Sequence, residues 1–238
     1  MPEPLLKVEN VHTFYGPLHV LKGVNYDLYD GEIVCLLGGN ASGKSTTMKT
    51  ILGLVRPGHG TIRYAGETIN DLSTAERVRR GIAPVPEARR LFPRMTVREN
   101  LEMGAFTRRG ADGYADRLER VFTLFPRLKE RRRQKAGTFS GGEQQMLAIA
   151  RGLMTDPEIL IIDELSLGLA PLFVYQLFAA LKALKDSGLT VLLVEQNVHL
   201  AFAVCDYAYV IAEGRLFSEG LPATLAAMPE IRRAYLGL

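Results

Sequence analysis

Four short runs of apolar residues stand out along this chain because no charged residue interrupts them. They cover residues 33–37, 82–85, 159–162 and 191–194. Continuous runs of this length are typical of strands that are buried on both faces of a sheet. Strands that alternate with helices predict an α/β fold with a mainly parallel sheet. The segments with helical periodicity lie at 44–53, 97 to about 133, from Gly141, after Pro171 and after Asn197.

The two ends of the chain carry shorter runs separated by Gly, Pro and Asp turn signals. Residues 5–37 predict short strands joined by turns, and residues 61–64 predict one more strand. Residues 73–80 predict a short polar helix. Two late runs, 207–211 and 216–219, predict a hairpin followed by terminal helices.

The most specific chemical feature lies between the first buried run and the helix after it. Residues 38–45 read Gly-Gly-Asn-Ala-Ser-Gly-Lys-Ser, a complete phosphate-binding loop. Its glycines let backbone N–H groups point at phosphate oxygens, and the following helix adds its positive N-terminal end. Lys44 is expected to reach the β- and γ-phosphates and Ser45 to hold Mg²⁺. The loop therefore predicts a nucleoside triphosphate as ligand.

A second feature complements this loop. The apolar run 159–162 ends at Asp163 and Glu164, and α/β sheets bind ligands at the carboxyl ends of their strands. Asp163 suits Mg²⁺, and Glu164 suits an attacking water. Phosphoryl transfer needs both a metal and a positioned water, so the pair and the loop together predict this chemistry.

Composition is that of an ordinary globular protein, with 238 residues of which 47 % are hydrophobic. We interpret Cys35, in a strand-like run, and Cys205, in an apolar helical run, as core residues without redox or metal chemistry. The first ten residues lack the pattern of a signal peptide, and no apolar run approaches bilayer length. We therefore expect a soluble, cytoplasmic protein.

Charge is distributed unevenly along the chain. The formal net charge is only +3, yet residues 77–135 hold 17 basic and 7 acidic side chains. A solvated helical surface explains this arginine-rich segment, and so does contact with an anionic partner, either membrane headgroups or nucleic acid. Composition alone does not choose between these explanations.

Residues 139–145, Phe-Ser-Gly-Gly-Glu-Gln-Gln, lie just before the acidic strand. Ser140 and Glu143 have the spacing of a helix capping box, and Gly141-Gly142 permits close backbone approach at the start of that helix. Capping alone accounts for the serine and the glutamate. Together with the phosphate loop and the acidic pair, however, the segment resembles the signature motif of ATP-binding cassette (ABC) ATPases. The resemblance implies that Ser140, Gly141, Gly142 and Glu143 face the γ-phosphate of ATP bound by an opposite subunit.

The resemblance extends over the whole chain and is most specific for the smaller ATPase subunit of branched-chain (hydrophobic) amino-acid importers. It rests there on residues 86–93, 166–171 and 194–197. Glu87 falls where most cassettes carry glutamine, and Gln196 falls where most carry a γ-phosphate-sensing histidine. The nucleotide-binding residues that the resemblance implies are Tyr15, Gly38, Gly39, Asn40, Ala41, Ser42, Gly43, Lys44, Ser45 and Thr46. Tyr15 would stack on adenine, and packing within its own hairpin is the alternative.

Several residues depart from the usual pattern. An amide can donate a hydrogen bond to phosphate but cannot become cationic, so Gln196 should stabilise charge less than histidine. Leu169 replaces an acidic residue that many cassettes carry, and this fits the subgroup. Ala41 and Ala88 replace glycine, and Leu165 replaces proline, which the subgroup itself does not do. Ala41 is the most notable, because its Cβ restricts the loop backbone.

The resemblance implies one ABC ATPase domain over residues 1–238. Its core of about 1–86 and 156–238 would include an N-terminal antiparallel β part, and an α-helical subdomain of about 87–155 would carry the signature. The implied reaction is hydrolysis of MgATP by in-line attack of a water that Glu164 polarises. Gln196 would contact the γ-phosphate region, and Ser45 and Asp163 would hold Mg²⁺.

The implied partners are a second, larger ATPase subunit, two membrane permeases and, indirectly, an extracytoplasmic binding protein for leucine, isoleucine or valine. A homodimer is expected to be possible in isolation. The chain would lie on the inner face of the cell membrane through the permeases, which its basic segment would grip, and nucleic acid would not be a partner. Two alternatives stay open. One is an importer of urea, amides or other small solutes, because permease and binding protein choose the cargo; the other is a soluble cassette ATPase that acts on ribosomes or DNA.

Overall fold

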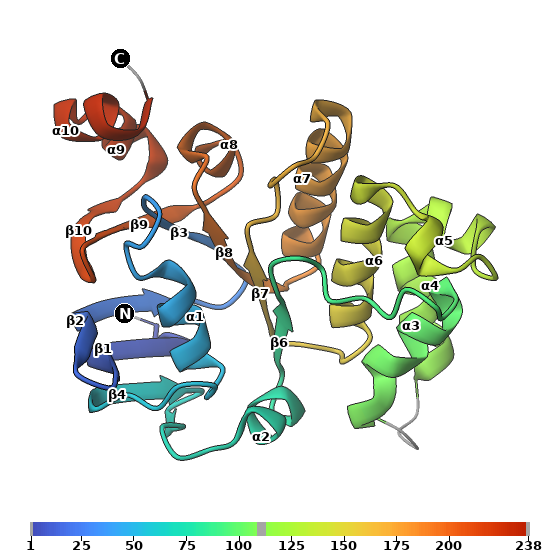
Figure 1. Cartoon of the computed structure of the whole chain (residues 1–238), viewed down its shortest axis with the longest axis horizontal. Coiled ribbons are helices and arrows are strands. Elements are labelled where there is room, and N and C mark those ends of the chain that lie inside the picture. Colours follow the sequence, from blue (N-terminus) through green and yellow to red (C-terminus); the bar gives the residue numbers. More distant parts are fainter. Residues whose placement is uncertain (1, 109–112, 237–238) are drawn as a thin grey trace.

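The predicted apolar runs are strands of one six-stranded sheet that crosses the middle of the molecule (Figure 1). The computed structural model describes residues 2–108 and 113–236. Neighbouring strands from β9 to β6 are parallel, and β10 pairs antiparallel with β9 at the edge. The mainly parallel sheet that the sequence predicts is confirmed. In spatial order the strands are β10 (Arg215–Gly220), β9 (Tyr207–Ala212), β3 (Ile33–Leu37), β8 (Thr190–Glu195), β7 (Ile159–Asp163) and β6 (Ile82–Val85).

A second, antiparallel sheet is built from N-terminal strands. Its order is β2 (Leu18–Leu28), β1 (Leu6–Tyr15), β4 (His59–Tyr64) and β5 (Glu67–Thr68). β1 and β2 span 10 and 11 residues, which is longer than the short strands expected. Their pairing contains register shifts, and bulges of this kind let a long ribbon bend and twist around a core.

Helix α1 (Lys44–Ile51) shares one core with both sheets. Met48 and Ile51 of α1 belong to the same buried cluster as Leu6 of β1 and Leu36 of β3. The helix predicted for 44–53 thus ends at Ile51. Helix α2 (Thr74–Arg79) corresponds to the predicted short polar helix and begins with a capping box at Ser73.

Between β6 and β7 the chain forms a series of helices. The continuous helical stretch expected from 97 to about 133 is broken, and its residues 109–112 lie outside the described part. Pro126 begins a new helix, and Phe125 before it leaves helical geometry with φ −128° and ψ 74°, because a proline disfavours helical backbone in the residue that precedes it. The helices are α3 (Val97–Gly104), η1 (Ala105–Arg108), α4 (Tyr114–Leu124), α5 (Pro126–Glu130), η2 (Ala136–Thr138) and α6 (Gly141–Leu153).

The remaining helices follow β7, β8 and β10 in the order expected. Cys205 lies in the loop after α8, and the expectation that it sits in a helix is wrong because α8 ends at Phe202. Cys35 is buried in β3, and both thiols are free. These helices are α7 (Pro171–Asp186), α8 (Val198–Phe202), α9 (Pro222–Ala227), α10 (Pro229–Ile231) and the terminal η3 (Arg232–Leu236).

One buried cluster joins the six-stranded sheet to the helices between β6 and β7. It contains Leu160 and Leu193 of the sheet, Leu177 of α7, Leu101 of α3 and Leu128 of α5. A division of the chain near residues 87 and 155 into core and helical subdomain stays a prediction. In the ranges 2–108 and 113–236 no helix combines the length and the apolar character needed to cross a membrane.

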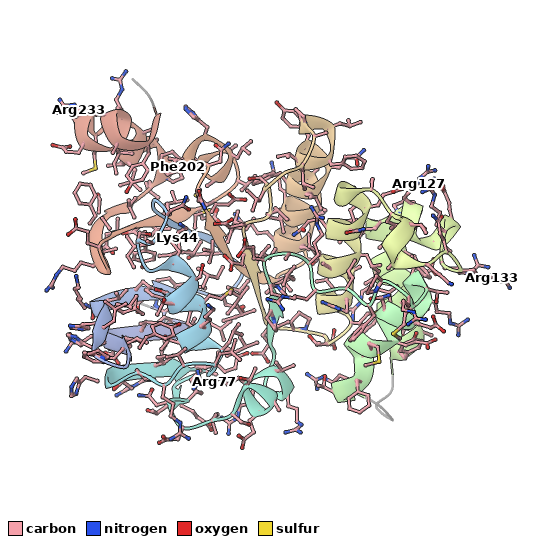
Figure 2. All side chains as sticks on the ribbon, viewed as in Figure 1. Lys44, Arg77, Arg127, Arg133, Phe202 and Arg233 are labelled. Carbon is pink, nitrogen blue, oxygen red and sulfur yellow. The ribbon has the colours of Figure 1, made fainter. Side chains whose placement is uncertain are left out.

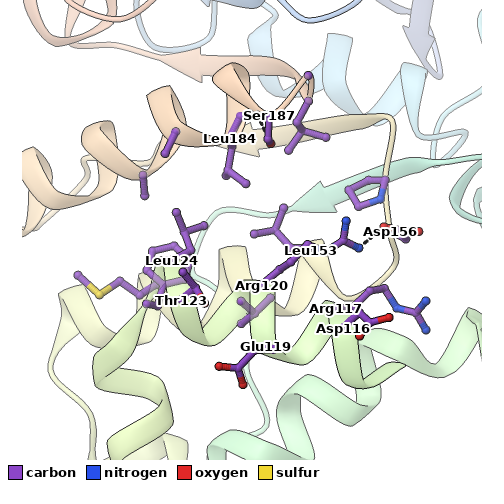
Figure 3. A pocket seen from close by; sticks show the side chains of 18 of the residues that line it. Asp116, Arg117, Glu119, Arg120, Thr123, Leu124, Leu153, Asp156, Leu184 and Ser187 are labelled. Carbon is purple, nitrogen blue, oxygen red and sulfur yellow. Dashed lines mark hydrogen bonds and ion pairs between the residues drawn. The ribbon is translucent and has the colours of Figure 1, made fainter. Parts of the chain in front are cut away.

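A groove of about 1370 Å³ separates α4 and α5 from α7 at the surface (Figure 3). Leu124, Leu153 and Leu184 line it, and an ion pair of 2.8 Å joins Arg120 to Asp156 beside it. None of the predicted nucleotide-site residues lines this groove.

Candidate functional site

The loop of residues 38–45 leaves β3 and turns into α1, and two glycines make the turn possible. Gly38 has a φ of 158° and Gly43 a φ of 113°. A Cβ on Gly38 would lie 2.3 Å from the carbonyl oxygen of Ile211, and a Cβ on Gly43 would lie 2.9 Å from Leu21 Cδ2. A side chain at either position would collide with β9 or β2. The loop therefore depends on glycine at both ends, as its spacing predicts.

The Lys44 ammonium lies against the backbone of this loop. Its Nζ donates to the carbonyl oxygens of Gly38 at 2.8 Å and Gly39 at 2.9 Å. Burial lowers the pKa of Lys44, while the charges of Glu164 and Asp163 act in the opposite direction. The lysine predicted to bind phosphate therefore lies within electrostatic reach of the two predicted acids.

Asp163 ends β7 and is only 3 % exposed. Burial, followed by the charges of Glu164 and Glu87, raises the pKa of Asp163 to about 6. Its Oδ1 is buried and has no hydrogen-bond partner among the described residues. A desolvated carboxylate of this kind favours a nearby cation.

These residues fit a magnesium ion. Mg²⁺ that acts with nucleotides is usually held by one or two protein oxygens, with phosphate oxygens and waters around it. The free Oδ1 of Asp163 and the hydroxyl of Ser45, the second residue of α1, offer that donor set. A bound dication would also offset the repulsion between Asp163 and Glu164.

The two predicted catalytic side chains touch each other. Gln196 Nε2 donates a hydrogen bond to Glu164 Oε1. Glu164 follows β7 with a left-handed φ of 50°, and its N–H donates to the carbonyl of Val194 at 2.8 Å. Residues 32 positions apart are thus brought together at the carboxyl ends of two neighbouring strands.

Glu87 follows β6 at the same end of the sheet, since its charge acts on Asp163. The next three residues, 88–90, have φ values of 59°, 63° and 49°. This unusual backbone is held from α6: Arg151 donates to the carbonyls of Arg89 at 3.0 Å and Arg90 at 2.6 Å. Arg89 in turn donates from Nε to Gln145 Oε1 at 3.2 Å.

The signature segment forms the capping box that its spacing predicts. The Glu143 N–H donates to Ser140 Oγ at 3.3 Å, and the Ser140 N–H donates to Glu143 Oε2 at 3.0 Å. Burial alone would raise the pKa of Glu143, but hydrogen bonds from Ser140 and the charges of Arg131 and Arg127 lower it. Glu143 is therefore engaged within its own chain, whereas Ser140 is exposed at the start of α6.

Comparison with known proteins decides the family. The family model of the ABC transporter matches residues 21–166. The high-affinity branched-chain amino acid transport ATP-binding protein BraG of Pseudomonas aeruginosa is 47 % identical over 98 % of this chain and all of its own length. The chain belongs to the ABC transporter family.

Solved structures agree with this cassette in fold. The ADP conformation of MJ1267, an ATP-binding cassette of an ABC transporter, superposes with a TM-score of 0.87 at 25 % identity over the full length of both chains. The dimeric post-hydrolysis state of the cassette MJ0796, bound to ADP and phosphate, gives 0.81 at 28 % identity over 91 % of this chain and 98 % of that one.

Some predicted site residues of the cassette stand apart from this cluster. Tyr15 ends β1 and is 42 % exposed. Among the described residues, no hydrogen bond or ion pair joins the signature residues 140–143 to the phosphate-binding loop. Loop residues Asn40 and Ala41 are exposed, while Ser42 is buried and Thr46 is half-buried.

Sequence reasoning missed three residues of this cassette: Glu195, Arg89 and Arg151. Glu195 ends β8 with 2 % exposure and receives hydrogen bonds from the loop after Glu164. The available signal was an acidic residue at the end of a continuous apolar run. Arg89 and Arg151 bind main-chain or amide oxygens, and such partners leave no recognisable spacing in the sequence.

Proposed function

We propose that this cassette hydrolyses MgATP to energise a binding-protein-dependent importer of branched-chain or other hydrophobic amino acids. The observation that carries the catalytic part is the convergence of Lys44, Asp163, Glu164 and Gln196 at the carboxyl ends of β3, β7 and β8. The full-length similarity to BraG and the subgroup motifs at 86–93, 166–171 and 194–197 support the transported class.

In this proposal the loop amides and Lys44 hold the phosphates, and Glu164 accepts a proton from the attacking water. Gln196 orients the Glu164 carboxylate through its amide and contacts the γ-phosphate region. Ser45 and Asp163 would hold Mg²⁺, which supplies positive charge to the β- and γ-phosphate oxygens when bound. Tyr15, exposed at the end of β1, would offer its ring to the adenine.

A second cassette would complete each site. Ser140, Gly141 and Gly142 begin a helix of 13 residues, and such an N-terminus attracts anions. This exposed N-terminus suits a γ-phosphate held by a partner cassette. The cassette MJ0796, which this chain resembles in fold, forms a dimer bound to ADP and phosphate. The partner would be a second, larger ATPase subunit, and a homodimer can form in isolation.

Two permeases would hold the cassette on the inner face of the cell membrane, and an extracytoplasmic binding protein would deliver the solute. Support comes from Phe92 and Met103, which are 42 % and 41 % exposed in the segment after Glu87. Asn100, buried in α3, holds the backbone of Phe92 through hydrogen bonds to its N–H and carbonyl. Phe92, held in place and exposed, suits contact with a permease helix, and the exposed basic side chains of the same segment suit anionic headgroups.

The catalytic proposal is tested with Glu164→Gln. The variant should bind ATP with nearly unchanged affinity while its turnover falls by about 10²-fold or more, because the amide cannot accept a proton. Glu119→Gln, on the exposed face of α4, is the matched control and should hydrolyse ATP normally. Normal hydrolysis by Glu164→Gln would dismiss Glu164 as the base.

The transport proposal is tested by purifying the tagged chain from its native membranes and identifying its partners by mass spectrometry. Two permeases and a second ATPase are expected. The accompanying binding protein, assayed with leucine, isoleucine, valine, urea and amides, would identify the cargo. Ribosomal or DNA-associated partners would contradict the importer.

A further inference from the structure

Glu195 contacts both loops that carry the proposed catalytic side chains. It is the last residue of β8, directly before Gln196, and is 2 % exposed. A buried carboxylate without a compensating partner is costly, so its hydrogen bonds indicate what it does in the fold.

The carboxylate receives donors from two different loops. Oε1 accepts the Ser166 N–H at 2.9 Å, and Oε2 accepts the Ser166 hydroxyl at 3.2 Å. Oε2 also accepts the N–H of Gln196 at 3.2 Å. The loop that follows β7 is therefore tied to the loop that follows β8 through one side chain.

This tie acts on a strained backbone. Glu164 has a left-handed φ of 50°, a conformation that a residue with a Cβ adopts only at a steric cost. Two attachments to the end of β8 oppose its relaxation: the Glu164 N–H bond to the Val194 carbonyl and the Ser166 bonds to Glu195. The same carboxylate fixes the backbone of Gln196, whose amide holds Glu164 Oε1.

We infer that Glu195 is a positioning residue for ATP hydrolysis, which sets the geometry of Glu164 and Gln196 by joining the loops that carry them. The inference rests on the proposed role of Glu164. A carboxylate suits this position because both of its oxygens accept hydrogen bonds. An amide would point its NH₂ group, which is a donor, at N–H or O–H groups that are themselves donors.

Glu195→Gln tests the inference. Turnover at saturating ATP should fall at least about 10-fold while the Kd for ATP changes less than about threefold, because the variant misplaces groups used in the reaction and leaves the phosphate loop intact. Ser166→Ala keeps the N–H bond to Oε1 and should lose less than about threefold. Glu158→Gln is the matched control and should keep normal turnover, because Glu158 directly precedes β7 and lies at the opposite end of that strand from Glu164.

A double-mutant cycle separates positioning from a general structural role. In the Glu164→Gln background, measured under single-turnover conditions, adding Glu195→Gln should lower the residual rate by clearly less than the loss of about 10-fold expected with Glu164 present, because only the placement of Gln196 is still affected. An equal loss in both backgrounds, or a Glu195→Gln variant with normal turnover, would overturn the inference.

Two further outcomes are informative. If Glu195→Gln does not fold, Glu195→Asp decides, because it keeps the charge and retracts the carboxylate by one methylene; a folded Glu195→Asp with normal turnover would overturn the inference. Normal hydrolysis by Glu164→Gln alone would refute the proposed base, and with it this role of Glu195. A slow Glu164→Gln beside a normal Glu195→Gln would refute only the positioning role.

Discussion

Ala41 and Ala88, where the sequence resemblance leads us to expect glycine, both have a left-handed backbone. Their φ values are 60° and 59°. Glycine adopts this region without the steric cost of about 1–2 kcal/mol that a Cβ brings, but it loses about 0.5–1 kcal/mol more entropy on folding. The departures therefore cost stability without removing a catalytic group.

Ala41→Gly should accordingly raise the free energy of unfolding by up to about 1 kcal/mol, because relief of strain exceeds the entropy lost. Urea unfolding followed by circular dichroism measures it. Ala75→Gly, at an exposed position inside α2, is the control and should lower the free energy by about 0.5–1 kcal/mol. If Ala41→Gly lowers the free energy of unfolding as much as Ala75→Gly does, the backbone of Ala41 is not strained.

Residues whose place in the fold follows from their spacing could be predicted from the sequence. Lys44 has a fixed place in the loop, and Asp163 and Glu164 have fixed places at a strand end, where the structure brings them within electrostatic reach. Arg77 shows the limit. It belongs to a helix expected to be polar, yet it is fully buried and donates to the Ile51 carbonyl at the end of α1, a contact that only tertiary structure creates.

At the scale of elements, Gly142 sets how closely α6 approaches α7. A Cβ on Gly142 would lie 2.2 Å from Cγ of Phe173, whereas the nearest atom to a Cβ on Gly141 would be Nη2 of Arg89 at 3.2 Å, the end of a flexible side chain. Gly142→Ala should therefore lower the free energy of unfolding by about 1–3 kcal/mol. Gly141→Ala should change the free energy of unfolding much less. Thermal unfolding of the two variants measures this, and equal losses would refute the packing argument.

The antiparallel sheet carries a histidine cluster contributed by three strands. Nδ1 of His12 in β1 lies 3.1 Å from Nε2 of His19 in β2, and the ring of His59 in β4 is 6.0 Å from the His12 ring. Burial first, then the charges of His19, His59 and Arg215, lowers the pKa of His12 from 6.5. The folded state therefore favours the neutral imidazole of His12.

The sign of the resulting pH dependence follows from linkage. Because the unfolded chain binds the His12 proton more tightly, the stabilisation is complete above about pH 6.5 and is lost as the pH falls through the lowered pKa. His12→Gln should make the free energy of unfolding less dependent on pH between about 7.5 and 5. Urea titrations at several pH values measure this, with His199→Gln in α8 as the control for losing one imidazole elsewhere; an unchanged slope in His12→Gln would contradict it.

Strands were more predictable than helix limits. Burial on both faces left β3, β7 and β8 as continuous apolar runs, whereas the two-residue β5 has no pattern of its own and pairs only through β4. The helical stretch after Thr96 kept its periodicity across breaks. Those breaks depend on how each short helix packs, which a one-dimensional pattern does not record.

At the scale of the whole molecule, basic side chains gather along one edge of the helical region. Residues 93–98 run antiparallel to 132–137 through several backbone hydrogen bonds, among them the Arg98 N–H to the Arg132 carbonyl. Five basic side chains on this two-stranded segment are exposed: Arg94, Arg98, Arg132, Arg133 and Lys135. Figure 2 places Arg133 at the edge of the helices, far from Lys44. Ion pairs with Glu130, Glu119 and Glu143 neutralise part of the neighbouring charge on Arg127, Lys129 and Arg131.

Reversing Arg132, Arg133 and Lys135 to glutamate together should reduce the fraction of the cassette retained on native membranes by several fold, because about 1 kcal/mol is associated with each basic residue near an anionic surface. Flotation of washed membranes measures retention. Lys182→Glu, on the exposed face of α7, controls for the loss of a positive charge. If the triple variant is retained on membranes as well as the unmodified cassette, these basic side chains form a solvated surface that does not bind the membrane.

One buried cluster lies between the six-stranded sheet and the helices that connect β6 to β7, so the sheet and these helices should open together. The groove beside α7 divides only the surface, while Leu101, Leu128, Leu160 and Leu177 remain in one cluster. The helices cannot detach without exposing the face of β7 that ends in the acidic pair. Amide protons of α6 and β7 should therefore exchange with solvent as one cooperative unit, and catalytic competence should be lost in the same opening event.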